Sequence, residues 1–196
     1  RTTLSSAANW DEPLPRPSGN VHSAVVPLEE KRRWFETLHR TCRGPRVVPG
    51  DPVAFLHGYP DLRDREVAGL VVSGLAYGRV RQILVSAGRV LRALGHRPSL
   101  TIMEAPDLVL ERLGAWRHRF TGAKELHALI RAAGAVLSGY GSLEAVVAEG
   151  AQGGEPAVAG LSHLVRRLRE CGAGERNSML ASPADGSACK RLFLYC

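Results

Sequence analysis

The basic residues best placed to do chemistry follow a turn rich in proline and glycine near the end of the chain. Pro183 and Gly186 mark the turn, and Ser187 opens a segment that we expect to be helical. Free backbone N–H groups and the dipole at a helix start attract phosphate. The pattern therefore predicts a phosphate contact in this segment, made by Gly186, Ser187, Lys190 and Arg191. The alternative is an ordinary corner between two helices, with solvated basic side chains.

Two further groups of arginines carry charge that could contact a nucleic acid. Arg117 and Arg119 flank His118. This group could touch phosphate, although a solvated basic turn is the commoner outcome for such a cluster. Arg79 and Arg81 occur where two expected central helices meet. The secondary candidates for nucleic-acid binding are therefore Arg79, Arg81, Arg117 and Arg119.

The acidic residues between positions 51 and 65 favour structural roles. Asp51, Asp61 and Asp64 occur there together with Arg63 and Arg65. Carboxylates in such mixed-charge stretches commonly cap helices or form surface ion pairs. We expect these two roles here and not general acid–base catalysis.

Signatures of several enzyme classes are absent. The sequence contains no Walker loop, no dinucleotide-binding fingerprint and no His-Glu-x-x-His motif. The four cysteines (Cys42, Cys171, Cys189 and Cys196) are scattered and include no Cys-x-x-Cys pair, which favours a reduced compartment. Cys189 and Cys196 would share one helical face, as small buried apolar residues do. We expect no catalytic residue, no cofactor and no metal site.

The composition is that of a folded globular protein with a basic surface. Of 196 residues, 44% are hydrophobic and 23% are charged, which excludes a wholly disordered chain. No apolar run approaches the roughly 20 residues needed to insert across a membrane. Aromatic residues, at 6%, are too few for a protein built around stacking single-stranded bases. The net charge of +7 favours a polyanionic partner such as nucleic acid, although codon bias in a GC-rich genome explains it equally well.

The beginning of the chain has the composition of a targeting segment. Residues 1–8 contain no acid and are rich in Ser, Thr and Ala, as in the tail of an organelle transit peptide. This favours a mitochondrial location, although an artificial chain boundary would look the same. Four prolines before residue 28 predict an extended arm over residues 1–27.

Helical periodicity dominates residues 28–196, and no strand-like alternation of useful length occurs. One helix is expected from residue 28 to about 43, followed by a loop over 47–60. Two helices within 61–95 meet at Tyr77-Gly78-Arg79. Asp107 is expected to cap a helix ending near Gly114, because Pro106 excludes a helix from upstream. Later helices are expected over 121–137, after a cap at Ser142, over 156–170 and from about 187.

The segment 61–95 should form the centre of an all-α domain. Its apolar stripe is wide, which is typical of a helix packed on several sides. The side chains expected to be nearly fully buried are Leu70, Leu75, Ile83, Leu84 and Leu91. The domain as a whole is expected to span residues 28–196 and to end in a hairpin-like motif at 181–192.

Six short motifs, taken together, resemble an uncharacterised family that carries only a domain-of-unknown-function label (DUF2400-like). They are DPVAF at 51–55, EVAGL at 66–70, SGLAYGRV at 73–80, RFTG at 119–122, YGSL at 140–143 and GSACKRL at 186–192. The resemblance covers roughly residues 29–196. That family is similar to the helix-hairpin-helix DNA glycosylase superfamily of base-excision repair.

This resemblance implies a fold and a mode of DNA binding. The fold would be an orthogonal helical bundle, truncated at its C-terminus relative to those glycosylases. Residues 66–94 look like the core helix pair of those enzymes, and residues 181–192 look like the hairpin whose turn amides hold a DNA phosphate. The catalytic Asp of the glycosylases follows that hairpin, beyond Cys196, and Ala188 stands where bifunctional members carry a lysine. A four-cysteine iron–sulfur cluster is absent as well.

The hypothesis that follows is a non-catalytic protein derived from a repair-type fold. It would bind RNA or DNA, or act as a scaffold with other proteins in an organelle ribonucleoprotein such as a mitochondrial ribosome. One alternative is a fragment of an active DNA glycosylase or lyase. Another is an accessory subunit of a different large organelle complex.

Overall fold

A computed structural model describes residues 27–42 and 50–195. The described residues do not include Cys196 or the expected arm up to residue 26, which contains residues 1–8. The chain divides into two compact units, residues 1–48 and 49–196. In the first unit, the expected helix is present as α1 (Leu28–Cys42), with Glu29 and Glu30 in its first turn, where the helix dipole favours acids. Helix α1 is therefore assigned to the first unit, whereas the helical domain expected from the sequence began at residue 28.

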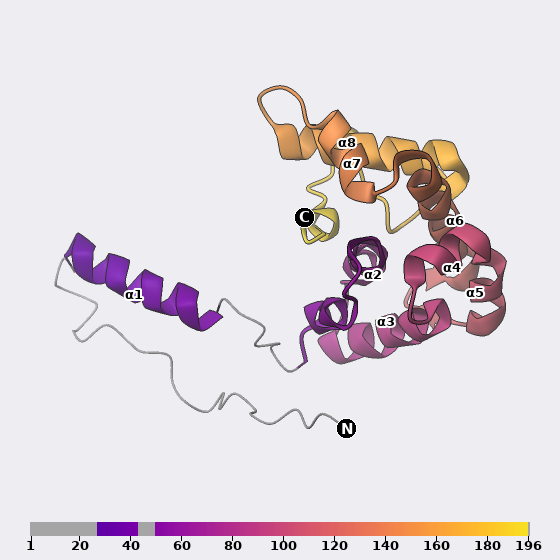
Figure 1. Ribbon diagram of the computed structural model, residues 1–196, viewed down its shortest axis with the longest axis horizontal. Coiled ribbons are helices and arrows are strands. Elements are labelled where there is room, and N and C mark those ends of the chain that lie inside the picture. Colours follow the sequence, from indigo (N-terminus) through magenta and orange to yellow (C-terminus); the bar gives the residue numbers. More distant parts are fainter. Residues whose placement is uncertain (1–26, 43–49, 196) are drawn as a thin grey trace. The chain divides into compact units, whose positions relative to one another are not determined.

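The second unit is almost entirely helical, which confirms the expected all-α class (Figure 1). Its larger helices are α2 (Leu62–Gly74), α3 (Val80–Leu94), α4 (Pro98–Glu104), α5 (Pro106–Leu113), α6 (Ala123–Tyr140), α7 (Leu143–Gly150) and α8 (Pro156–Leu168). Shorter pieces are the 3₁₀ helices η1 (Pro52–Gly58) and η3 (Pro183–Asp185), the π-helical η2 (Arg169–Ala173) and the single turn α9 (Lys190–Phe193). Two short strands, β1 (Arg117–His118) and β2 (Thr121–Gly122), pair antiparallel.

Helix α2 is the centre of this unit. Figure 1 shows it nearly end-on, between α3 and the α7–α8 pair. All residues from Val67 to Leu75 are buried, and α2 contacts η1, α3, α4, α7 and α9. A helix that is buried on all sides needs small and apolar residues around its whole circumference, and this segment provides them. The expected central helix is confirmed.

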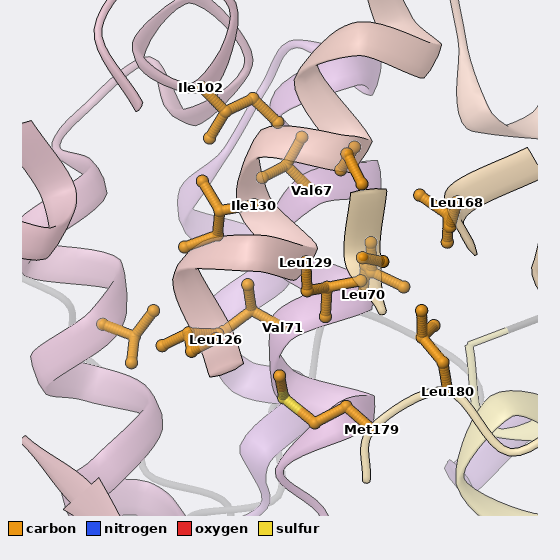
Figure 2. Close-up of a cluster of buried hydrophobic side chains, with 14 of the residues drawn as sticks. Val67, Leu70, Val71, Ile102, Leu126, Leu129, Ile130, Leu168, Met179 and Leu180 are labelled. Carbon is orange, nitrogen blue, oxygen red and sulfur yellow. The ribbon is translucent and has the colours of Figure 1, made fainter. Parts of the chain in front are cut away.

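Helix α6 supplies the other main surface of the core. Its face of Leu126, Leu129 and Ile130 lies close to Val67, Leu70 and Val71 of α2 (Figure 2). Leu168, Met179 and Leu180 close the same cluster, so the segment after α8 is part of the core. The buried face expected for α6 is confirmed.

Four sequence-based expectations about local structure were wrong. Leu84 is only half-buried, because α3 lies at the edge of the unit and presents one face, including Ile83, Ala87 and Leu91, to the core. Helix α4 ends at Glu104, two residues before Pro106, so the proline does stop the upstream helix, but Asp107 is not the cap of the next one. Ala105 is the N-cap of α5, and Asp107 lies within its first turn. The expected loop over 47–60 contains η1.

The fourth wrong expectation is the helix predicted to begin at about Ser187. Helix α9 begins only at Lys190 and is four residues long. Cys189, directly before it, adopts a left-handed conformation (φ 44°, ψ 33°) that no continuous right-handed helix can include. Within the described residues, no helix combines the length and the apolar composition needed to cross a membrane.

Candidate nucleic-acid interface

The hairpin-like segment 181–192 is closed by its own polar groups. Gly186 ends η3 in a left-handed conformation, as expected of a turn glycine. The Ser187 hydroxyl accepts a hydrogen bond from the Cys189 backbone N–H (3.2 Å), and the Cys189 thiol donates to the carbonyl of Ala181 (3.3 Å). Cys189 is buried, as expected. Because α9 is a single turn, the extended helix start that would attract a phosphate is not formed here.

Arg191 and Lys190 play different parts in this segment. The Arg191 guanidinium donates hydrogen bonds to the carbonyls of Gly74 (2.8 Å) and Ser178, and it lies 4.8 Å from the centre of the Tyr77 ring. It therefore ties the last helix to the end of α2. Lys190 is exposed and forms no salt bridge among the described residues. Of the two basic residues predicted to contact phosphate in this segment, only Lys190 is free to do so without breaking internal bonds.

Tyr77 joins three segments that are far apart in the sequence. Its hydroxyl donates to the carbonyl of His118 (3.0 Å) and lies 2.6 Å from the Thr121 hydroxyl. The Thr121 hydroxyl in turn lies 2.9 Å from that of Ser178. Because a carbonyl can only accept, the Tyr77 hydroxyl donates to the His118 carbonyl. The Thr121 hydroxyl then donates to Tyr77, and the Ser178 hydroxyl donates to Thr121. This chain of bonds fixes the α2–α3 connection against the β1–β2 hairpin.

His118 is a structural residue of the hairpin. Its Nε2 lies 3.1 Å from the Tyr77 carbonyl and its Nδ1 lies 2.9 Å from the Ser86 hydroxyl. The imidazole donates through Nε2, since the carbonyl can only accept, and in the neutral ring Nδ1 accepts from Ser86. The side chain is buried. The expectation that His118 touches phosphate or lies in a solvated turn was therefore wrong.

The turn between β1 and β2 exposes one arginine and one aromatic ring. Arg119 adopts a left-handed conformation with φ of 54°. Phe120 follows, and its ring stacks on that of Tyr77, with centres 4.8 Å apart and planes at 19°. The Phe120 side chain remains 57% exposed.

Gly78 allows the Arg119 side chain to lie across the α2–α3 connection. A β-carbon at Gly78 would lie 3.1 Å from Arg119 Nη1, and the residue has φ of +101°, which favours glycine. The Arg117 guanidinium donates to the Arg119 carbonyl (2.7 Å), which holds the turn from its other side. The Arg119 side chain therefore lies against Gly78, the residue before the N-cap of α3.

Four exposed arginines lie on the two segments that meet at this point, and we call them together the arginine face: Arg79, Arg81, Arg117 and Arg119. Arg79 is the N-cap of α3 and makes no side-chain capping bond, and Arg81 follows in the first turn. Within the described part of the chain, no acid forms a salt bridge with any of the four. Their positive charge is therefore available to an external anion. These secondary candidates lie on the α2–α3 connection, the start of α3 and the β1–β2 hairpin, whereas Gly186 and Ser187 belong to the closed turn before α9.

The three aspartates between positions 51 and 65 accept hydrogen bonds at helix starts. Asp61 accepts from the backbone N–H of Arg63 (2.9 Å) at the start of α2, and Asp51 does the same for Val53 (2.8 Å) at η1. Buried Asp64 accepts from both the N–H and the hydroxyl of Ser99, at the start of α4. The predicted structural role of these acids is confirmed.

A similar cap joins α2 to α7. The carboxylate of Glu66 accepts from the N–H groups of Leu143 (3.0 Å) and Glu144 (2.9 Å). The Ser142 hydroxyl accepts from the N–H of Ala145 at the same helix start, as predicted. Across the described residues, no group of three or more His, Cys, Asp and Glu side chains is placed to hold a metal ion.

A cavity of about 590 Å³ beside α8 also contains arginines, but their charge is neutralised. Arg166 pairs with Glu170 (2.8 Å), and Arg169 pairs with Asp185 (2.8 Å). The hydrogen bonds from Arg166, and then from Arg167, hold the pKa of the Glu170 carboxyl below its ordinary value. This cavity therefore offers no free positive charge to an anion.

Sequence reasoning missed the residues that organise the arginine face: Tyr77, Phe120, Thr121 and Ser178. Tyr77 was noted only as the junction of two helices, and Phe120 and Thr121 only as part of a motif. Their contacts join positions more than 40 residues apart in the sequence, and no local spacing predicts such a pairing. The available signal was the presence of YGR and RFTG among the distinctive motifs.

The profile of one protein family, described as a protein of unknown function (DUF2400), matches residues 51–196. This stretch is most of the chain and nearly all of its second unit. The chain therefore belongs to this family, as its motifs indicated. No curated protein and no solved structure matches the chain.

Proposed function

We propose that this member of the DUF2400 family is a non-catalytic protein that binds nucleic acid, or serves as a scaffold on it, through phosphate contacts of the arginine face. The observation that carries the proposal is the contact between Arg119 of the β1–β2 hairpin and Gly78 of the α2–α3 connection, two segments that together carry four exposed arginines with no salt bridge among the described residues. Arginine is well suited to this role because its planar guanidinium binds phosphate oxygens in pairs. The net charge of +7 adds long-range attraction for a polyanion.

The finer proposal is a fold related to the helix-hairpin-helix DNA glycosylases. It is supported by the motif resemblance and by the helical class of the second unit, in which residues 66–94, expected to correspond to the core helix pair of those enzymes, form most of α2 and α3. Because the turn at 181–192 is closed by its own polar groups, we place the centre of phosphate binding at the arginine face and not at this hairpin-like motif. A part in an organelle ribonucleoprotein, such as a mitochondrial ribosome, is proposed from the charge and from the composition of residues 1–8.

The first prediction concerns the salt dependence of binding. Each lost phosphate contact should reduce the slope of log affinity against log salt by about 0.9 on duplex DNA. The double variant Arg79→Ala/Arg119→Ala should therefore lower the slope by about 2 and weaken binding equally on unrelated sequences, because phosphates carry no base information. Fluorescence anisotropy with labelled DNA and RNA duplexes, over a series of salt concentrations, measures both quantities.

The matched control is Arg97→Ala/Arg131→Ala, which removes two exposed arginines, one at the N-cap of α4 and one within α6. It changes the net charge by the same amount but leaves the arginine face intact. An equal loss of affinity and slope in both double variants would reduce the proposal to a general charge effect. No measurable binding by the native chain would reject it.

The enzyme alternative needs a separate readout. The same protein, incubated with duplexes that contain damaged bases or abasic sites, should leave the strands intact. Strand cleavage that survives repurification and is abolished by changing one residue of this chain would favour the glycosylase or lyase instead.

A further inference from the structure

Phe120 presents an aromatic face that the fold does not use. One side of its ring packs on Tyr77, at 4.8 Å between centres and 19° between planes, and the side chain is still 57% exposed. A parallel stack at this distance covers one face of the phenyl ring, so the exposed area includes the opposite face. The ring sits at the tip of a two-residue turn, where a polar residue would satisfy the backbone equally well.

The ring is held in place by groups that do not depend on a ligand. Tyr77, on whose ring Phe120 stacks, is fixed by hydrogen bonds to the His118 carbonyl (3.0 Å) and the Thr121 hydroxyl (2.6 Å). The Arg191 guanidinium also lies over the Tyr77 ring, at 4.8 Å, and is itself bonded to two carbonyls. A planar ligand that stacked on Phe120 would therefore meet an ordered surface and incur little further entropy cost.

The surroundings of the ring select the charge of its ligand. Arg119 is the preceding residue, and its side chain crosses Gly78, which is followed by Arg79. Neither arginine forms a salt bridge among the described residues. A ligand that fills this surface must offer a flat apolar group and a negative charge a few bonds away. An unstacked nucleobase with its own phosphate has both features, whereas an apolar protein segment would leave the two guanidinium groups unpaired.

We propose that the outer face of Phe120 is a stacking platform for a single unpaired nucleobase, with Arg119 and Arg79 bound to the adjoining phosphate. The inference rests on the proposed function and adds the preferred form of nucleic acid, a helix interrupted by an unpaired nucleotide. With 6% aromatic residues, the chain has too few rings for a track along a long single strand, so the proposal is limited to one unpaired nucleotide at Phe120. The shared chemistry is base stacking, which DNA and RNA both provide.

The test compares a perfect hairpin duplex with the same duplex carrying one bulged aminopurine, a fluorescent base whose emission falls when it stacks. DNA and RNA versions are used with the full chain. Stacking on an aromatic side chain should give the bulged form at least about fivefold tighter binding, with quenched aminopurine emission. A preference in the DNA pair, the RNA pair or both supports the platform and identifies the nucleic acid it serves.

The variants isolate the aromatic face. Phe120→Leu keeps an apolar contact with Tyr77 but cannot stack, so the bulge preference and the quenching should disappear while affinity for the perfect duplex stays within about twofold, because phosphate contacts are unchanged. Phe120→Trp should retain both effects. Phe193→Leu, which alters another exposed aromatic ring (40% exposed) on α9, is the matched control and should behave as the native chain. Circular dichroism verifies that each variant is folded.

The outcomes separate this inference from the proposed function. Equal affinity of the native chain for bulged and perfect duplexes overturns the platform and leaves phosphate binding by the arginine face intact. Loss of the preference in Phe193→Leu, or its retention in Phe120→Leu, also overturns the platform. Absence of binding to every probe overturns both.

Discussion

The side chains of two adjacent basic residues, Lys190 and Arg191, differ in exposure: that of Lys190 is exposed, and that of Arg191 is partly buried. Lys190 extends from α9 into water, whereas Arg191 turns inward to the Gly74 and Ser178 carbonyls and to the Tyr77 ring. The carbonyl of Gly74 belongs to the last turn of α2, where no further residue of that helix is available to donate. A guanidinium suits this place because it can bond two carbonyls and lie over an aromatic ring at once.

Replacing Arg191 by Ala should therefore affect folding more than binding. The two carbonyls would lose a charged donor, and hydrogen bonds to charged groups contribute about 1.5–3 kcal/mol. We expect the free energy of unfolding to fall by about that amount, and Lys190→Ala to change it by less than about 0.5 kcal/mol. Urea denaturation followed by circular dichroism measures both. Equal effects of the two substitutions would contradict the inward role of Arg191.

For single residues, the sequence predicts hydrogen bonds between positions that are close in the chain. The Ser142 cap and the capping role of Asp51 and Asp61 were predicted correctly, because donor and acceptor lie within three residues of each other. The different orientations of Lys190 and Arg191 could not be predicted, since the Arg191 bond to Gly74 spans 117 positions. The burial of His118 depends in the same way on Tyr77 and Ser86.

Helices α4 and α6 pack unusually closely at one glycine. A β-carbon at Gly134 of α6 would overlap the backbone carbonyl oxygen of Ile102 in α4. Backbone cannot move aside as a flexible side chain can, so the two helices depend on the missing side chain at this position. The sequence predicted α6 and its buried face from periodicity. It missed α4, which is only seven residues long and too short to show a period.

A pair of glycine substitutions in the same helix tests this contact. Gly134→Ala should lower the free energy of unfolding by about 1–3 kcal/mol, because it forces the two helices apart. Gly139→Ala, where nothing lies within 4 Å of the added carbon, should raise it by up to about 1 kcal/mol through better helix propensity. Thermal unfolding monitored at a helical wavelength distinguishes the two signs. Stabilisation by both substitutions would show that α4 and α6 are not in contact at Gly134.

At the scale of the whole molecule, the hydrophobic core of the described residues lies within the second unit. Among the described residues, the buried core side chains lie between Val67 and Leu192, and the partly buried side chains packed on them begin at Phe55. The family profile begins at residue 51, two positions after the unit begins. Periodicity predicted the helical class. The division after residue 48 was not predicted, because α1 has the same apolar spacing as a helix that packs on a core.

The last prediction is that residues 49–196 fold without residues 1–48. A fragment limited to this unit keeps every side chain of the core cluster and every residue of the arginine face. Its melting temperature should differ from that of the full chain by less than about 2 °C, which corresponds to under about 1 kcal/mol for a chain of this size. Its salt slope for duplex binding should also match. Calorimetry and the anisotropy titration provide the two measurements. A melting temperature many degrees lower would show that the first unit stabilises the second, whereas a reduced slope with unchanged melting would place additional phosphate contacts within residues 1–48.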